Sequence, residues 1–274
     1  MPRPLLDPQT AGLLASWTAA ATVGRVTVAQ AVAAIQAGAD GHVVRGLAPP
    51  SSELAPPSSE LALADVLARV VDGRPRLLRV AFPAPGDPLG LQGAGPFTSS
   101  ALLAQSAVVI EHDTPFGLVP EPDLRGSSYR GVRWQVYELD HATSPPLTVE
   151  PSRVVEQADR ALRRALRAAT DALQGLDLAR WRPEAAVGGH EAGAALRSRP
   201  LTLPPGWPPA ARALAERAVA LWRMLDVATA DDAAASVSAA AVRSTTLREL
   251  SHAVREAAMV AFNVPASALL VRPA

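Results

Sequence analysis

The chain has 274 residues, 49% of them hydrophobic, so it is long enough to bury a sizeable core. Its 26 acidic residues are balanced by 26 basic ones, all of them arginine, which excludes a strong overall field for nucleic acid or an anionic membrane. Because the chain has no cysteine, it cannot form a disulfide, a thiolate metal site or a cysteine nucleophile.

Two helices are predicted at the start of the chain. Asp7 is placed to cap the first helix, whose apolar residues recur at helical spacing up to Gly24. Thr27 and Gln30 form a capping box that opens the second helix, which is expected to end at Gly38. Together these segments predict an N-terminal helical hairpin.

A seven-residue duplication follows, in which residues 48–54 and 55–61 both read APPSSEL. Paired prolines favour an extended backbone over helix or sheet interior. Residues 47–59 are therefore interpreted as a Pro-rich connector, and the duplication as an insertion that the fold tolerates.

A third helix is predicted directly after the duplication. Ser58 or Ser59 is placed to cap it, and Glu60 would then lie in the first turn, near the positive end of the helix dipole. The apolar positions continue at helical spacing as far as Asp72.

The central part of the chain changes to patterns typical of strands. Short apolar runs bounded by Pro or Gly are expected to form buried strands at residues 76–82, 106–112 and 131–139. Residues 116–121 are expected to form a short edge strand that Pro120 limits. Residues 98–105 predict one or two helical turns capped by Thr98 or Ser99.

Helical periodicity returns after the central part and persists. Amphipathic helices are predicted at residues 152–175 and 208–228. Whether residues 232–262 form one helix or two is left open, because Thr246 and Glu249 make a second capping box inside this region. Asn263 and Pro265 are expected to end it.

These elements predict an α+β chain with an N-terminal helical hairpin, a small, mostly antiparallel central sheet and a C-terminal bundle of three or four helices. The predicted domains are residues 1–146, with the hairpin and the sheet, and residues 147–274, with the bundle. Strands and helices alternate too little for a doubly wound fold.

A glycine-rich stretch follows the first predicted strand, where phosphate-binding loops occur. Its glycine spacing does not match such a loop, no lysine follows, and Pro96 removes a backbone amide. The stretch is therefore interpreted as a shaped loop, with a ligand-binding loop as the alternative. The ligand candidates in that alternative are Gly90, Gly93, Gly95, Thr98 and Ser99.

The second predicted strand ends in the sequence Glu111-His112-Asp113. Along a strand Glu111 and Asp113 would share one face, and such a carboxylate pair suits acid–base catalysis or a metal. A solvated pair at the end of a strand is the other interpretation. No metal is predicted, because the sequence has no thiolate and no His pair at ligand spacing on one element. No cofactor is predicted either, and the sequence has no nucleophile elbow, zinc-binding helix or phosphate-loop motif.

The helix predicted at residues 152–175 carries a row of arginines opposite its leucines: Arg153, Arg160, Arg163, Arg164 and Arg167. Glu156 and Asp171 lie on the same face and neutralise part of its charge. No aromatic residues are interleaved to stack on bases. The face is interpreted as solvated and suited to an acidic partner, with nucleic-acid phosphates as a further alternative.

The lack of a complete catalytic set favours a non-catalytic cytoplasmic protein that acts in assembly, partner binding or self-association through its helices. The first alternative is a small-molecule-binding protein or enzyme whose site lies where the glycine-rich loop meets the sheet edge. The second is a nucleic-acid-associated protein. No membrane association is predicted, because no apolar run reaches the roughly 18 residues that a membrane span needs.

Overall fold

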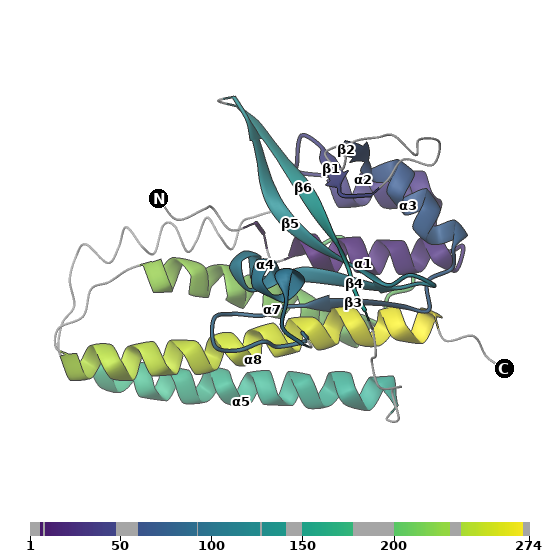
Figure 1. Cartoon of the computed structure of the whole chain (residues 1–274). Coiled ribbons are helices and arrows are strands. Elements are labelled where there is room, and N and C mark those ends of the chain that lie inside the picture. The colour runs from purple at the N-terminus through teal and green to yellow at the C-terminus, as the bar shows by residue number, and fades with distance from the viewer. Residues whose placement is uncertain are drawn as a thin grey trace. The chain divides into compact units, whose positions relative to one another are not determined.

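Figure 1 shows the computed structural model of the chain, which describes residues 6–7, 9–47, 60–91, 93–126, 128–140, 150–177, 200–230 and 237–270. Within these residues the chain combines helices with a six-stranded mixed sheet, so the predicted α+β class is confirmed. The chain divides into two compact units. The first comprises Met1–Pro151, Thr202–Pro208 and Phe262–Ala274, and the second comprises Ser152–Leu201 and Pro209–Ala261.

The sheet of the first unit has the strand order β2–β1–β6–β5–β4–β3. The strands are β1 (His42–Arg45), β2 (Glu60–Ala62), β3 (Leu77–Ala81), β4 (Ala107–Glu111), β5 (Phe116–Arg125) and β6 (Tyr129–Glu138). β1 and β6 run parallel, and the other neighbouring strands run antiparallel. β5 and β6 form a long hairpin whose far end projects beyond the other strands (Figure 1).

The helices of the first unit are α1 (Gln9–Thr22), α2 (Val28–Gln36), α3 (Leu63–Asp72) and α4 (Pro96–Ala104). The predicted caps of the first two are confirmed. Asp7 Oδ1 accepts a hydrogen bond from the Gln9 amide at 3.1 Å. Both reciprocal bonds of the Thr27–Gln30 capping box are present.

The two faces of the sheet differ in what covers them. α1 contacts β3 and β4, and α3 contacts β1 and β2, on the face that buries Val44, Leu78, Val108, Leu118 and Trp134. α4 contacts β5 on the other face, where Phe97 packs directly over Gly117. We call this second face the α4 face. α4 covers it over β4, β5 and Tyr137 of β6, and charged side chains occupy much of the remainder.

Segments that are distant in sequence complete the first unit. The indole Nε1 of Trp17 donates to the Thr202 carbonyl at 2.8 Å. The fully buried ring of Phe262 lies so close to α1 that a Cβ at Gly12 would be 2.4 Å from it. The N-terminal unit is therefore built partly from a segment between two of the C-terminal helices and from the end of the last helix.

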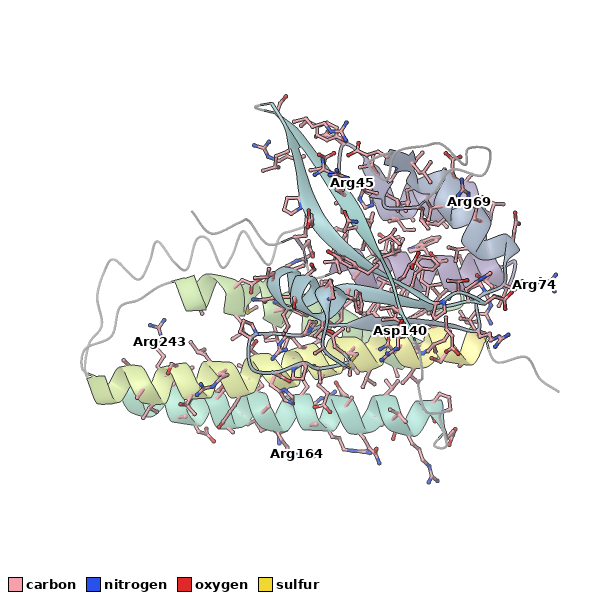
Figure 2. All side chains as sticks on the ribbon, viewed as in Figure 1. Arg45, Arg69, Arg74, Asp140, Arg164 and Arg243 are labelled. Carbon is pink, nitrogen blue, oxygen red and sulfur yellow. The ribbon has the colours of Figure 1, made fainter. Side chains whose placement is uncertain are left out.

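The helices of the second unit are α5 (Pro151–Asp177), α7 (Pro209–Ala230) and α8 (Val237–Leu270). The unit begins at Ser152 of α5 and includes α8 only as far as Ala261. The buried positions of α5 recur every seven residues at Val155, Leu162 and Ala169. Asp159 of α5 pairs with Arg217 of α7, and Arg243 of α8 donates to the Ala228 carbonyl at the end of α7. Figure 2 shows Arg164 projecting outward from α5.

The predicted start of the third helix is wrong. Glu60 lies in β2 and not in a helical turn, and the N-cap of α3 is Ala62, which makes no side-chain cap bond. Ser58, Ser59 and the connector at residues 48–59 lie outside the described residues. The helix starts later than predicted because Glu60 makes contacts that are distant in sequence, with Arg125 and Arg133 of the β5–β6 hairpin.

The prediction of a short edge strand limited by Pro120 is also wrong, since β5 has ten residues and lies between β6 and β4. β5 pairs with β4 only over Phe116–Leu118, so in the described chain its later residues have no strand on that side. The Val132 amide donates toward β1, to Gly41. Pro122, opposite Val132, and Pro120, two residues before it, therefore have their nitrogens on the open side of the strand, where proline is tolerated.

α8 runs as one helix from Val237 to Leu270, which answers the open question about this region and contradicts the predicted stop at Asn263 and Pro265. Leu250 and Val254 continue a buried face past the internal capping box. Pro265 is buried too, so packing in the first unit offsets the hydrogen bond that proline removes from a helix.

Among the described residues, the stretch Ala240–Leu270 of α8 is long and apolar enough to cross a membrane, judged by length and composition alone. Half of its most apolar window is buried inside the protein. A buried core helix passes the same test, so this feature is weak evidence for a membrane span.

Candidate functional site

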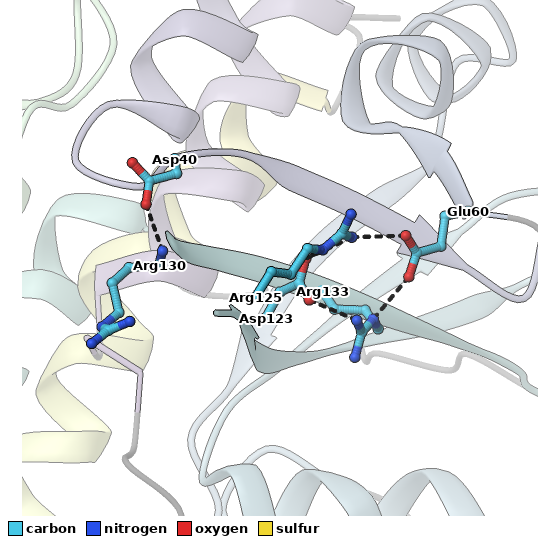
Figure 3. Close-up of polar contacts among 6 residues, drawn as sticks. All are labelled: Asp40, Glu60, Asp123, Arg125, Arg130 and Arg133. Atoms are coloured by element: carbon cyan, nitrogen blue, oxygen red, sulfur yellow. Dashed lines mark hydrogen bonds and ion pairs between the residues drawn. The ribbon is translucent and has the colours of Figure 1, made fainter. Parts of the chain in front are cut away.

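Four charged side chains form a closed network on the part of the α4 face that α4 leaves free (Figure 3). We call these residues, Glu60, Asp123, Arg125 and Arg133, the arginine clamp. The side chain of Asp123 is only 2% exposed, and each of its oxygens holds one arginine. Oδ2 accepts from Arg125 Nε at 2.8 Å, and Oδ1 accepts from Arg133 Nη2 at 2.6 Å.

Glu60 completes the network from the solvent side. Its Oε2 accepts from Arg125 Nη2 at 2.8 Å, and its Oε1 accepts from Arg133 Nε at 3.1 Å. The pKa of Arg125 is raised above its usual value, first by the hydrogen bond to Asp123 and to a smaller degree by Glu60. Each of the two arginines thus bonds two carboxylates, the buried one of Asp123 and the more exposed one of Glu60.

The hairpin register explains how these residues meet. Asp123 and Arg125 are two residues apart on β5, so they share a face, and they lie opposite Gly131 and Tyr129 of β6. The Tyr129 side chain packs against Gly131 and Gly41, where there is no room for a larger residue. A Cβ at Gly131 would lie 2.6 Å from the ring, and a Cβ at Gly41 would lie 2.8 Å from the phenol oxygen. The Arg125 guanidinium lies 5.5 Å from the centre of the same ring, a cation–π contact that further fixes Arg125.

A second polar contact anchors the start of β6. The Asp40 amide donates to the Arg130 carbonyl at 2.9 Å, and the Asp40 carboxylate accepts from the Arg130 amide (Figure 3). Asp40 precedes β1, so this contact holds β1 and β6 together beside the clamp.

The glycine-rich candidates form a bent loop leading into α4. Gly90, Gly93 and Gly95 have φ values of 81°, 73° and 153°, conformations that favour glycine. Gly95 is the N-cap of α4 and no side chain caps it, so the predicted cap by Thr98 or Ser99 is wrong. The Thr98 hydroxyl instead donates to the Gly93 carbonyl, and the Ser99 amide donates to the Gly95 carbonyl.

The acidic candidates are divided between a strand and a turn. β4 ends at Glu111, so the expectation that Glu111 and Asp113 lie along one strand is wrong. Asp113 lies in the following turn and pairs with Arg76 at 3.4 Å, with both side chains largely exposed. The His112 ring packs against Gly73 at the end of α3.

Arg79 of β3 connects the loop candidates with the acidic ones. Its Nη1 donates to the Gly90 carbonyl at 2.9 Å, and it lies diagonally across the ladder from Glu111. Burial lowers the pKa of Arg79, and the charge of Glu111 partly offsets this. In the part of the chain that the structure describes, no group of three His, Asp or Glu side chains is placed to hold a metal ion.

The arginine candidates all lie exposed on α5, at Arg153, Arg160, Arg163, Arg164 and Arg167. Arg160 pairs with Glu156 at 3.6 Å, and Arg163 pairs with Asp159 at 2.8 Å. Arg164 and Arg167 make no ion pair with any described residue.

Two family models match the sequence. One, described as Rv1486c-like protein, N-terminal domain, matches residues 11–150, and the other, described as Rv1486c-like protein, C-terminal domain, matches residues 156–259. The chain belongs to the Rv1486c-like protein family. Comparisons with curated proteins and with solved structures gave no match.

The compact units of this Rv1486c-like chain do not follow the two family matches along the sequence. Thr202–Pro208 falls inside the C-terminal match, yet it packs with the N-terminal unit. Phe262 lies beyond both matches and also belongs to the N-terminal unit. The N-terminal unit therefore needs residues that the N-terminal match does not include.

Sequence reasoning missed the arginine clamp. The charged residues Asp123 and Arg125 alternate along a strand, as does Arg133 on the next one, and this spacing could have predicted a polar face. Nothing local points to Glu60, which is separated from Arg125 by 65 positions.

Proposed function

We propose that this protein has no catalytic role and binds an acidic protein partner through the exposed arginine face of α5. One observation carries the proposal: Arg164 and Arg167 are exposed on this helix and have no ion-pair partner among the described residues. Their neighbours Arg160 and Arg163 are paired with carboxylates of the same helix. The face therefore carries two exposed guanidinium groups, those of Arg164 and Arg167, that a partner can bind.

The chemistry of arginine favours a carboxylate-bearing partner. A guanidinium binds a carboxylate through two parallel N–H donors, and it is more weakly hydrated than a lysine ammonium. The same face is less suited to binding nucleic acid, because α5 has no aromatic residue that could stack on bases. Charges at the rim of an interface speed association and make it sensitive to salt.

A site-specific photo-crosslink tests the proposal. A photoreactive amino acid at Ala168, which is exposed on α5 beside Arg167, should form adducts with a protein in the native cell. The control carries the same group at Leu103, which is 80% exposed on α4. We expect an adduct that is specific to Ala168, weakens with added salt and disappears when Arg164→Glu and Arg167→Glu are introduced.

Three outcomes would contradict the proposal. An adduct that survives both charge reversals would show that the arginines do not make the contact. Adducts with nucleic acid alone would favour phosphate binding by the same face. Adducts only with further copies of the chain would replace an acidic partner with self-association.

A further inference from the structure

We propose that Arg125 and Arg133 form a binding site for the carboxylate of an external ligand, and that Glu60 occupies this site as an internal substitute. The site lies on the sheet of the first unit and is independent of the α5 face. Arg133 uses Nε for Glu60 and Nη2 for Asp123, so its two contacts are separate. Arg125 holds Asp123 through Nε, while its Nη2 lies 2.8 Å from both carboxylates. Each arginine therefore keeps at least one N–H group on Asp123 when Glu60 leaves.

The arginine pair is preorganised by its surroundings. Asp123 is buried and bonds both guanidinium groups, and the Tyr129 ring lies under Arg125. The two arginines come from adjacent paired strands, which fixes the distance between them. Long side chains that are held in place before binding lose less conformational freedom when a ligand arrives.

Glu60 is the exchangeable member of the clamp. Its side chain is 33% exposed, whereas that of Asp123 is 2% exposed. Glu60 also belongs to β2, an edge strand of three residues that pairs only with β1. Ion pairs that remain in contact with water contribute little to stability, so a dissolved anion can compete for this place.

Charge and geometry both favour a carboxylate over a phosphate. When Glu60 leaves, the two arginines and Asp123 keep one net positive charge, which a single carboxylate balances. Glu60 already shows the fit, because each of its two oxygens accepts from a different arginine, at 2.8 Å and 3.1 Å. A phosphate would bring more negative charge close to Asp123.

The duplicated sequence has to be considered in any test. Glu53–Leu54–Ala55 has the same sequence as β2, Glu60–Leu61–Ala62. A variant that changes Glu60 alone therefore leaves a second glutamate in the same local sequence, so the test replaces both glutamates and leaves Asp123 in place.

The test follows the Nε–H signal of Arg133 in the full-length protein by NMR while sodium acetate is added, with sodium chloride as the ionic-strength control. Glu53→Gln combined with Glu60→Gln should bind acetate roughly tenfold more tightly than the parent, since the parent site is vacant only part of the time. Inorganic phosphate should bind this variant less tightly than acetate. Replacing Arg125 by Gln in the same variant should remove the acetate response.

A control variant of the same net charge shows whether tighter acetate binding comes from the loss of Glu60 or from the loss of negative charge in general. Glu121 lies opposite Arg133 on the same face and makes no ion pair with a described residue, so Glu53→Gln with Glu121→Gln removes equal charge and leaves Glu60 in place. This control should bind acetate as weakly as the parent. Equal binding by both variants, a response that chloride reproduces, or tighter binding of phosphate would overturn the proposal.

The parent protein supplies an independent measurement if the Glu60 variant does not fold. Acetate at high concentration should displace Glu60 and move the Arg133 Nε–H signal, while chloride at the same ionic strength should not. A signal that stays unchanged up to the highest acetate concentration would contradict the exchange of Glu60.

Discussion

The side-chain amide of Asn263 bonds both backbone groups of Val80. Its Oδ1 accepts from the Val80 amide at 2.7 Å, and its Nδ2 donates to the Val80 carbonyl at 2.9 Å. Val80 is fully buried in β3, the last strand of the sheet. The amide therefore takes the place that a further strand would occupy, and Asn263 is the only asparagine in the chain.

Replacing Asn263 should destabilise the N-terminal unit. Asn263→Ala leaves the backbone amide and carbonyl of Val80 without partners, and each unpaired buried group costs about 1–3 kcal/mol. Asn263→Asp keeps the shape of the side chain but places a second acceptor against the Val80 carbonyl, so it should also lower stability. Urea unfolding monitored by circular dichroism measures both effects. An unchanged midpoint for Asn263→Ala would show that water replaces the bonds at no cost.

Gly12→Ala should lower stability although alanine is the better helix former. The substitution favours α1 by about 1 kcal/mol through helix propensity. The new methyl group would lie 2.4 Å from the Phe262 ring, however, and overpacking a core costs about 1–3 kcal/mol. Thermal unfolding of the variant gives the sign of the net effect.

A double-mutant cycle provides the control for the Gly12 prediction. Phe262→Leu removes the ring that blocks the methyl group, so it should cost less free energy of unfolding in the Gly12→Ala background than in the parent. Additive effects of the two substitutions would mean that Phe262 does not oppose the methyl group.

Deleting one copy of the duplication should change stability very little. Removal of residues 48–54 or of 55–61 gives the same shortened chain, because the copies are identical. The connection between the end of β1 at Arg45 and the start of β2 at Glu60 is halved, and a glutamate remains at the start of β2. Halving a loop changes its closure free energy by about 0.6 kcal/mol, equivalent to a shift of about 1–2 °C in melting temperature. A drop of many degrees would show that the first copy has a structural role.

Local signals predicted those parts of the fold that short stretches of sequence determine. The capping box of Thr27 and Gln30 is present because both partners lie within one helical turn. The same kind of signal at Thr246 failed, because the buried face of α8 continues through it. Pro120 failed as a strand limit because its effect depends on which side of β5 has a neighbouring strand.

The candidate sites also differ in whether they depend on local sequence or on contacts between distant residues. The arginine row on α5 depends only on helical periodicity, and the exposed arginines lie where the sequence placed them. The arginine clamp depends on β2 and the β5–β6 hairpin meeting across the sheet, with Glu60 and Arg133 separated by 73 positions. Hydrophobic periodicity within a strand carries no information on contacts of this range.

The most direct test of partner binding through α5 compares three purified baits in extract of the native cell: the parent, Arg164→Glu with Arg167→Glu, and Arg74→Glu with Arg248→Glu. The last pair changes the net charge equally at exposed positions outside α5. Circular dichroism should be the same for all three, because the buried face of α5 is untouched. We expect the α5 reversal to retain roughly tenfold less of an acidic protein that the parent and the control both retain at low salt. Equal retention by all three baits would contradict the proposed role of the α5 face.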